Sequence, residues 1–287
     1  MPSLIDIRRR IRSVKNTRQI TKAMKMVSAA KLRRAQDRVI AARPYAEIMQ
    51  RMLANVAQAV DEQDEDGMSP LLARRPEERI QMLLITADRG LVGGFNANVI
   101  RATQNFIRDH GQAKIELEAI GRKGRDFFRR RQAVLSGEHV GLFQKVVRLE
   151  DAREIANKVI DRFEKAEIDA VYVAVNRFKS VMAPQLSLER ILPVDVPKDK
   201  EQIDYIFEQD PKELLAELLP RYVQAQILRA MLESSAAEHA ASMTAMEAAS
   251  KNAGEVIQKL TLNMNRVRQA SITREIIEIV SGASALG

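Results

Sequence analysis

The sequence predicts a mixed α/β fold plus a coiled coil: long N- and C-terminal helices pair antiparallel, and an α/β domain is inserted between them. Heptad-spaced apolar residues run along both ends of the 287-residue chain, as expected for helices that lie along other helices. In the middle, apolar runs alternate with helix-like stretches, which is typical of a mostly parallel sheet. Aromatic residues make up only 4% of the chain, a composition that favours long helices.

The first segment, residues 1–62, is predicted to be one helix with a continuous heptad seam. Spacings of four and three residues alternate without a slip, through Ile7, Ile11, Val14, Arg18, Thr21, Lys25, Ser28, Leu32, Ala35, Val39, Ala42, Ala46, Met49, Leu53, Val56 and Val60. Pro44 removes one helical hydrogen bond, so we expect a kink or a local break there.

The first seam is polar over four successive positions, Arg18, Thr21, Lys25 and Ser28. Beside them Ile20, Met24 and Val27 form an apolar ridge that points in another direction. Two interpretations stay open: the helix has a second partner surface here, or its packing shifts locally.

The middle of the chain is expected to begin with a linker. An acidic run, Asp61–Gly67, ends the first helix, and residues 63–78 have the composition of a solvated connection. Residues 79–208 form the predicted Rossmann-like α/β domain. Its expected strands are 80–86, 115–120 and 170–175, its expected helices are 97–109, 122–131 and 150–166, and 185–194 is expected as an antiparallel edge strand.

The closing segment, residues 209–287, is the second predicted coiled-coil helix. Asp210 has the character of an N-cap, and Pro211 suits the first helical position. The second seam passes through Leu218, Tyr222, Ala225, Arg229, Leu232, Ala236, His239, Met243, Met246, Ser250, Ala253, Ile257, Leu260, Met264 and Val267. After Val267 the apolar register jumps five residues to Ile272.

The end of the closing helix is apolar on several sides, at Ile272, Ile276, Ile277, Ile279 and Val280. The closing helix is expected to be about 25 Å longer than its partner, at ~1.5 Å per residue. A lone helix with apolar residues on several sides needs surroundings, because it would otherwise be prone to aggregate. We therefore expect partner proteins to form a sleeve around it.

The stretch ADRGLVGGFNAN, residues 87–98, resembles a phosphate-binding turn but lacks the required residues. It has neither the Lys and Ser/Thr of a Walker loop nor the GxGxxG spacing of a dinucleotide site. It is predicted to be a tight strand-to-helix turn capped by Asn96. The turn Gly121-Arg122-Lys123-Gly124 is kept as a weaker candidate for holding an anion.

No catalytic residue, cofactor site or metal site is expected. The chain has no Cys, and its three His residues, His110, His139 and His239, lack metal-ligand spacing. Glu275 and Glu278 share one helix face but are an ordinary solvated pair by themselves. No apolar run is long enough to span a bilayer, so a soluble, cytoplasmic chain is expected.

The positive charge is concentrated in one segment. Residues 1–60 hold 14 Lys and Arg against three acidic residues, although the whole chain has a net charge of +8. Charge alone allows a coiled-coil scaffold whose basic helix binds nucleic acid, or a helix that binds an acidic protein. A nucleotide-binding enzyme that uses the α/β domain is a third reading, but it lacks a motif.

Three stretches, residues 7–36, 86–96 and 268–285, resemble the gamma subunits of F-type, rotary ATP synthases. The last is the most specific, since Ile272, Thr273, Glu275, Glu278, Gly282 and Ala283 fit the family signature. The resemblance implies a non-catalytic rotor shaft that couples proton-driven rotation of the c-ring to sequential changes in the catalytic beta subunits. It also implies alpha, beta, epsilon and c subunits as partners, and a peripheral place on the cytoplasmic face of the bacterial inner membrane.

The same resemblance assigns partner contacts to two groups of residues. Ile20, Lys22, Met24, Lys25 and Val27 are expected to meet the acidic lever segment of a beta subunit. Arg268 and Gln269 are expected to touch beta-subunit loops. The tip residues Thr273, Glu275, Ile276, Glu278 and Ile279 are expected to contact the alpha/beta ring, with the apolar ones turning in an apolar collar.

Overall fold

The computed structural model describes residues 3–60, 69–180, 184–196 and 209–284. Its contacts divide the chain into two compact units: Met1–Ser28 with Met243–Gly287, and Ala29–Ser242. This division cuts through both long helices, so it does not test the four expected segments. The acidic run 61–66 lies outside the described residues.

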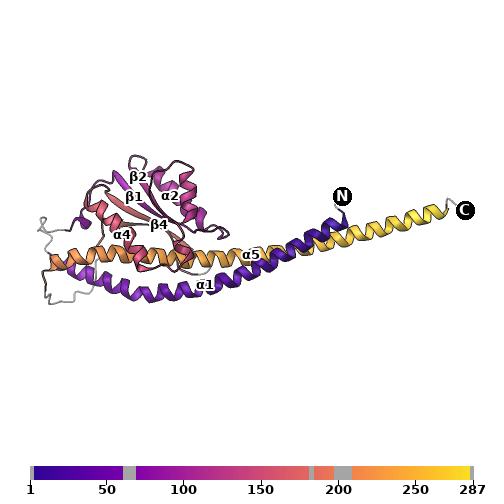
Figure 1. Ribbon diagram of the computed structural model, residues 1–287, viewed down its shortest axis with the longest axis horizontal. Helices are drawn as coiled ribbons and strands as arrows, with labels where there is room; N and C mark the ends of the chain where they lie inside the picture. Colours follow the sequence, from indigo (N-terminus) through magenta and orange to yellow (C-terminus); the bar gives the residue numbers. More distant parts are fainter. Residues whose placement is uncertain (1–2, 61–68, 181–183, 197–208, 285–287) are drawn as a thin grey trace. The chain divides into compact units, whose positions relative to one another are not determined.

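Two long helices carry the seams. Helix α1 spans Leu4–Ala59 and α5 spans Pro211–Ser284. In the first unit, Lys25 Nζ lies 2.6 Å from Glu247 Oε1, and a Cβ at Gly254 would lie 3.6 Å from Arg18 Cζ. In the second unit, Val39 and Ala46 line one cavity with Leu232. Within the first unit, rising numbers in α1 match falling numbers in α5, so the two helices pair antiparallel (Figure 1).

The helix ends and interruptions follow the local sequence. Pro211 begins α5, and Asp210 Oδ1 accepts a hydrogen bond from Lys212 N at 2.9 Å, as predicted for a cap. Helix α1 continues through Pro44 without the break that we considered. Pro44 and Ile40 are both exposed, so water can reach the Ile40 carbonyl that lacks its helical donor.

A five-stranded sheet forms the centre of the second unit, in the order β3-β2-β1-β4-β5. Its strands are β1 (Arg79–Ile85), β2 (Lys114–Ile120), β3 (Leu135–His139), β4 (Ala170–Phe178) and β5 (Pro184–Leu192). β1 pairs parallel with both β2 and β4, while β5 pairs antiparallel with β4. This order confirms the Rossmann-like α/β domain and the antiparallel edge.

Three helices connect the strands: α2 (Phe95–Asp109), α3 (Arg122–Arg129) and α4 (Leu149–Glu164). Short 3-10 turns, η2 (Pro70–Leu72) and η3 (Leu142–Gln144), complete the elements. The expected helices are all present, but β3 was missed. Its sequence, LSGEH, is half-buried and pairs only along one edge, so it has no apolar run to reveal it.

The two faces of the sheet carry different side chains. One core cluster joins the sheet to α2 and α3 through Met82, Leu84, Val99 and Phe128, all buried. Glu118, on β2, is fully buried, and its Oε1 lies 2.9 Å from His139 Nε2 and 3.3 Å from Lys158 Nζ. Burial favours a higher pKa for Glu118, but the His139 hydrogen bond and the Lys158 charge outweigh it and lower the pKa.

Candidate functional site

The apolar ridge on α1 is exposed, whereas two of the four polar seam positions beside it are buried. Ile20 and Val27 are 59% and 56% exposed, and Met24 is exposed as well. Thr21 and Ser28, on the seam, are buried. The packing register therefore does not shift, and the ridge is a separate outward surface, as the first interpretation predicts. Nothing in the described residues identifies what it contacts.

Cations line a cleft on a face of α1 that does not include the ridge residues. An open cleft of about 960 Å³ in the first unit is lined by five cations, Lys15, Arg18, Lys22, Lys25 and Lys251, and by Glu247. Lys25 is already bound to Glu247, whereas Lys22 is exposed. This part of α1 thus offers positive charge on one face and exposed apolar side chains on another. Lys25 has a partner within this chain that the sequence did not reveal.

The end of α5 has no buried face. Met264, Val267 and Ser271 remain half-buried in the old seam register, but Ile272 is exposed. Ile276 and Ile279 are 55% and 71% exposed. The apolar stripe that begins at Ile272 is therefore not part of the packing within the described chain.

The polar residues of the same end are also exposed: Arg268, Gln269, Glu275 and Glu278. Thr273 Oγ1 donates to Gln269 O at 3.0 Å, so this hydroxyl is engaged along its own helix. The antiparallel register places the α1 ridge beside residues near 250 of α5, about 30 Å along the helix from Ile272. The two groups of predicted contact residues therefore form two separate surfaces.

The turn from β1 to α2 is a structural element, but Asn96 does not cap the helix. The N-cap is Gly94 and has no side-chain bond. Asn96 Oδ1 instead accepts a hydrogen bond from Ala87 N at 2.9 Å, across the turn. Leu91 and Gly93 adopt positive φ angles of 65° and 56°, so the turn closes through left-handed residues, of which Gly93 is the unstrained one.

The first amide groups of α3 are all used within the protein. Arg122 N donates to Asp88 Oδ1, Lys123 N to the Ala87 carbonyl and Gly124 N to Thr86 Oγ1. A Cβ at Gly121 would lie 2.0 Å from Thr86 O, so this glycine permits a close approach of two backbones. These amide groups are therefore not available to an anion, so the weaker candidate, an anion-binding turn at residues 121–124, is not supported.

A buried titratable cluster escaped the sequence analysis. Glu238 and His239 of α5 line a cavity of about 60 Å³ with Lys31, Asp88 and Arg89. Burial, reinforced by the Asp88 carboxylate, raises the pKa of Glu238 to about 7. Burial, with Lys31 nearby, lowers the pKa of His239 to about 4. The sequence analysis placed His239 on the seam. It could not show that the adjacent Glu238 faces Lys31, Asp88 and Arg89, which come from other segments.

Within the described ranges, no cluster of His, Cys, Asp or Glu has the geometry of a metal site. None of the described helices is long and apolar enough to cross a bilayer.

Comparisons with known proteins give full-length matches. The model of a family described as ATP synthase matches residues 3–286. The ATP synthase gamma chain of Solibacter usitatus (strain Ellin6076) is 58% identical over 285 residues, which cover 99% of each chain.

Solved structures agree in fold. A chain of the Euglena gracilis mitochondrial ATP synthase, in its OSCP/F1/c-ring part, aligns with a TM-score of 0.68 at 19% identity, covering 99% of this chain and 94% of that one. A chain of the central stalk and c-ring of the Tetrahymena thermophila mitochondrial enzyme aligns with a TM-score of 0.61 at 25% identity, covering 80% and 99%.

Proposed function

Since the chain belongs to the family of ATP synthase gamma chains, we propose that it is the non-catalytic rotor subunit of a proton-translocating ATP synthase. In this role it couples rotation of the c-ring to sequential conformational changes in the catalytic beta subunits. Residues 1–62 and 209–287 are the shaft, 63–78 is a linker, and 79–208 is the domain at its foot. The partners are the alpha and beta subunits, the epsilon subunit and the c-ring.

One observation carries the proposal: the end of α5 has exposed apolar residues on more than one side. Ile272, Ile276 and Ile279 lie on a helix that no described residue of this chain covers. Burying such side chains contributes roughly 1.5–3 kcal/mol each. An apolar collar formed by the alpha/beta ring supplies that burial while leaving the helix free to turn.

The second surface suits the transmission of torque. The ridge of Ile20, Met24 and Val27 offers an apolar strip to an acidic lever segment of beta, and Lys22, on another face of the same stretch of α1, offers a positive charge. Unequal contact with three beta subunits biases each catalytic site differently, because a contact shifts an equilibrium only through its different affinity for the two states. Arg268 and Gln269 add polar contacts to beta loops.

The location follows from the partners. The subunit is peripheral and is held at the cytoplasmic face of a bacterial inner membrane through the complex. The full-length relatives are named as gamma chains, and no observation favours the nucleic-acid scaffold.

Co-purification tests the assignment. A tagged chain is extracted from native membranes in mild detergent, its partners are identified, and Mg-ATP hydrolysis is measured. We expect alpha, beta, epsilon and c subunits with ATPase activity. Recovery of the chain without these subunits would refute the rotor function.

Two substitutions test the contacts. Ile276→Asp places a charge in the collar and is expected to reduce ATP synthesis at least tenfold. Met24→Lys adds a cation beside the lever and is expected to reduce synthesis more than hydrolysis. Ile276→Val, Met24→Leu and Val134→Asp, the last at an exposed site on the α/β domain, are the matched controls. Normal synthesis by Ile276→Asp would exclude the collar.

A further inference from the structure

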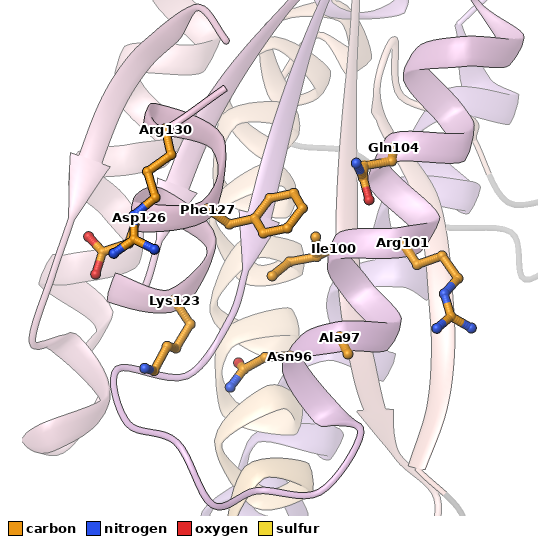
Figure 2. A pocket seen from close by; sticks show the side chains of 9 residues that line it. All are labelled: Asn96, Ala97, Ile100, Arg101, Gln104, Lys123, Asp126, Phe127 and Arg130. Carbon is orange, nitrogen blue, oxygen red and sulfur yellow. The ribbon is translucent and has the colours of Figure 1, made fainter. Parts of the chain in front are cut away.

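A groove of about 490 Å³ lies between α2 and α3 of the α/β domain, and none of the predicted contact residues of the shaft lines it. Its floor is apolar: Ile100 of α2 and Phe127 of α3 point toward each other between the two helices (Figure 2). Ile100 is buried and Phe127 is half-buried. A ligand with an apolar side chain can rest on this floor.

Cations stand along the groove. Lys123 lies on α3, Arg130 caps its C-terminal end, and Arg101 lies on the rim formed by α2; all three are exposed (Figure 2). None of them forms an ion pair with a carboxylate in the ranges that the structure describes. Asp126 is the single acid of the lining, and Arg125 Nη2 already binds it at 2.7 Å. That hydrogen bond, with Arg130 and Arg122 nearby, lowers the pKa of Asp126.

The spacing of the cations selects between anions. Lys123 and Arg130 are seven residues apart on one helix, which is about 10 Å along its axis. This separation suits two anionic groups, one for each cation, better than a single phosphate. In addition, the amide groups at the start of α3 are engaged within the protein. The groove therefore suits several separate anionic groups.

The apolar floor selects between macromolecules. Phe127 is the single aromatic ring of the lining, and the Arg131 guanidinium lies 3.7 Å from its centre. Base stacking on that side of the ring is thus blocked, and single strands are generally held by stacking. A polypeptide with carboxylates on both sides of an apolar residue matches the floor and the cations together.

We propose that the α2–α3 groove is a docking site for an acidic segment of another polypeptide. One apolar side chain of that segment rests on Ile100 and Phe127. Two carboxylates, about two helical turns apart, meet Lys123 and Arg130, and Arg101 attracts a third acidic group at the rim. The contact fixes the partner to the α/β domain, so that partner turns with this chain.

Photo-crosslinking in the assembled complex tests the proposal. Benzoylphenylalanine replaces Gln104, which is exposed at the groove, in the full chain, and the crosslinked peptide is sequenced. We expect one segment with at least two Asp or Glu residues around an apolar residue. The triple variant Arg101→Glu, Lys123→Glu, Arg130→Glu should reduce the yield at least fivefold. Changing the identified carboxylates to Lys should restore it.

A charge-matched triple variant controls for net charge: Arg108→Glu, Arg153→Glu and Lys179→Glu, all at exposed positions outside the groove. It should leave the yield unchanged. The proposal is overturned by a crosslink to nucleic acid, lipid, a second copy of this chain or a segment without acids. It is also overturned by no crosslink, or by equal loss in both triple variants. Purification of the complex reports separately on the rotor function.

Discussion

Two parts of one helix, α5, are equally apolar in sequence but differ in burial. Between Pro211 and Ser242, buried residues occur on opposite faces of the helix: Leu232 lines a cavity with Val39 of α1, and Ala237 packs on Val92 and Phe95. Between Ile272 and Val280, the apolar residues are exposed. The first part has its surroundings in the same chain, and the second requires them from others.

The difference teaches how to interpret a helix that is apolar all round. Such a pattern predicts burial, but it does not tell whether the covering atoms belong to the same polypeptide. In the sequence, only the seam of the partner helix indicates how much of α5 can be covered within the chain. The helix that carries this seam, α1, begins at Leu4. Substitutions in the two parts should therefore have opposite consequences for the isolated chain and for the complex.

The largest expected effect is on the first part of α5. Met231 is fully buried, so Met231→Asp places a carboxylate in an apolar environment without a partner. We expect a loss of more than about 4 kcal/mol in the free energy of unfolding, measured by urea denaturation followed by circular dichroism. A cooperative transition at the wild-type midpoint would mean that this part of α5 is not covered.

A pH series of two variants sharpens the description of the first part. The pKa of Glu238, about 7, lies above its ordinary 4.5. Its contribution to the free energy of unfolding is therefore present below pH 4.5 and is lost between pH 4.5 and 7. The pKa of His239, about 4, lies below 6.5, so its contribution is lost as the pH falls from 6.5 to 4. Each shift corresponds to at most about 3 kcal/mol, and the two slopes oppose each other.

Removing either group should reveal the other slope. Glu238→Gln should become more stable as the pH rises from 4 to 6.5, and His239→Gln should become less stable from 4.5 to 7. Lys31, Asp88 and Arg89 face the same cavity and remain in both variants. Melting temperatures at half-unit pH steps measure the slopes. Parallel profiles for the two variants would contradict the burial of this pair.

A smaller effect is expected at the turn whose neighbours, Val92 and Phe95, cover Ala237. Asn96→Ala removes the acceptor of the Ala87 amide and should cost about 1–3 kcal/mol in unfolding free energy, because that amide loses its partner. Asn98→Ala, at an exposed position of the same helix, is the control. Equal denaturation midpoints for both variants would show that the bond across the turn is dispensable.

The smallest effect on the isolated chain is expected in the second part of α5. Ile276→Asp lies on an exposed surface and should change the free energy of unfolding by at most ~0.5 kcal/mol. The same urea titration as for Met231→Asp measures it. A loss of several kcal/mol would show that this end is covered within the chain itself.

Much of this architecture could be predicted from periodicity. The seam of α1 marks its buried face from Ile7 to Val60, and Ile20 and Val27 were correctly placed outside it. β3 could not be found, because a short edge strand with Gly137 in it has no two-residue apolar pattern. The prediction that Asn96 caps α2 was wrong. An Asn just before a helix and an Asn just inside it can form different hydrogen bonds, and the sequence does not distinguish the two positions.

The exposed end of α5 could be predicted from the sequence, whereas the contacts of Lys25 and Glu238 could not. Exposed apolar residues at Ile272 and Ile279 are evident from the register jump. The partner of Lys25, Glu247, lies more than 200 residues away in the chain, and no local pattern indicates it. The cavity at Glu238 likewise requires four segments to come together, which only tertiary structure provides.

The order of synthesis gives the antiparallel pairing of α1 and α5 a further consequence. Helix α1 leaves the ribosome first, but its partner begins about 150 residues later, at Pro211. At about 5–20 residues per second, the apolar seam of α1 stays uncovered for roughly 10–30 seconds. During that interval the α/β domain can fold alone, while the nascent seam depends on chaperones or on its abundant Lys and Arg to stay free of aggregation.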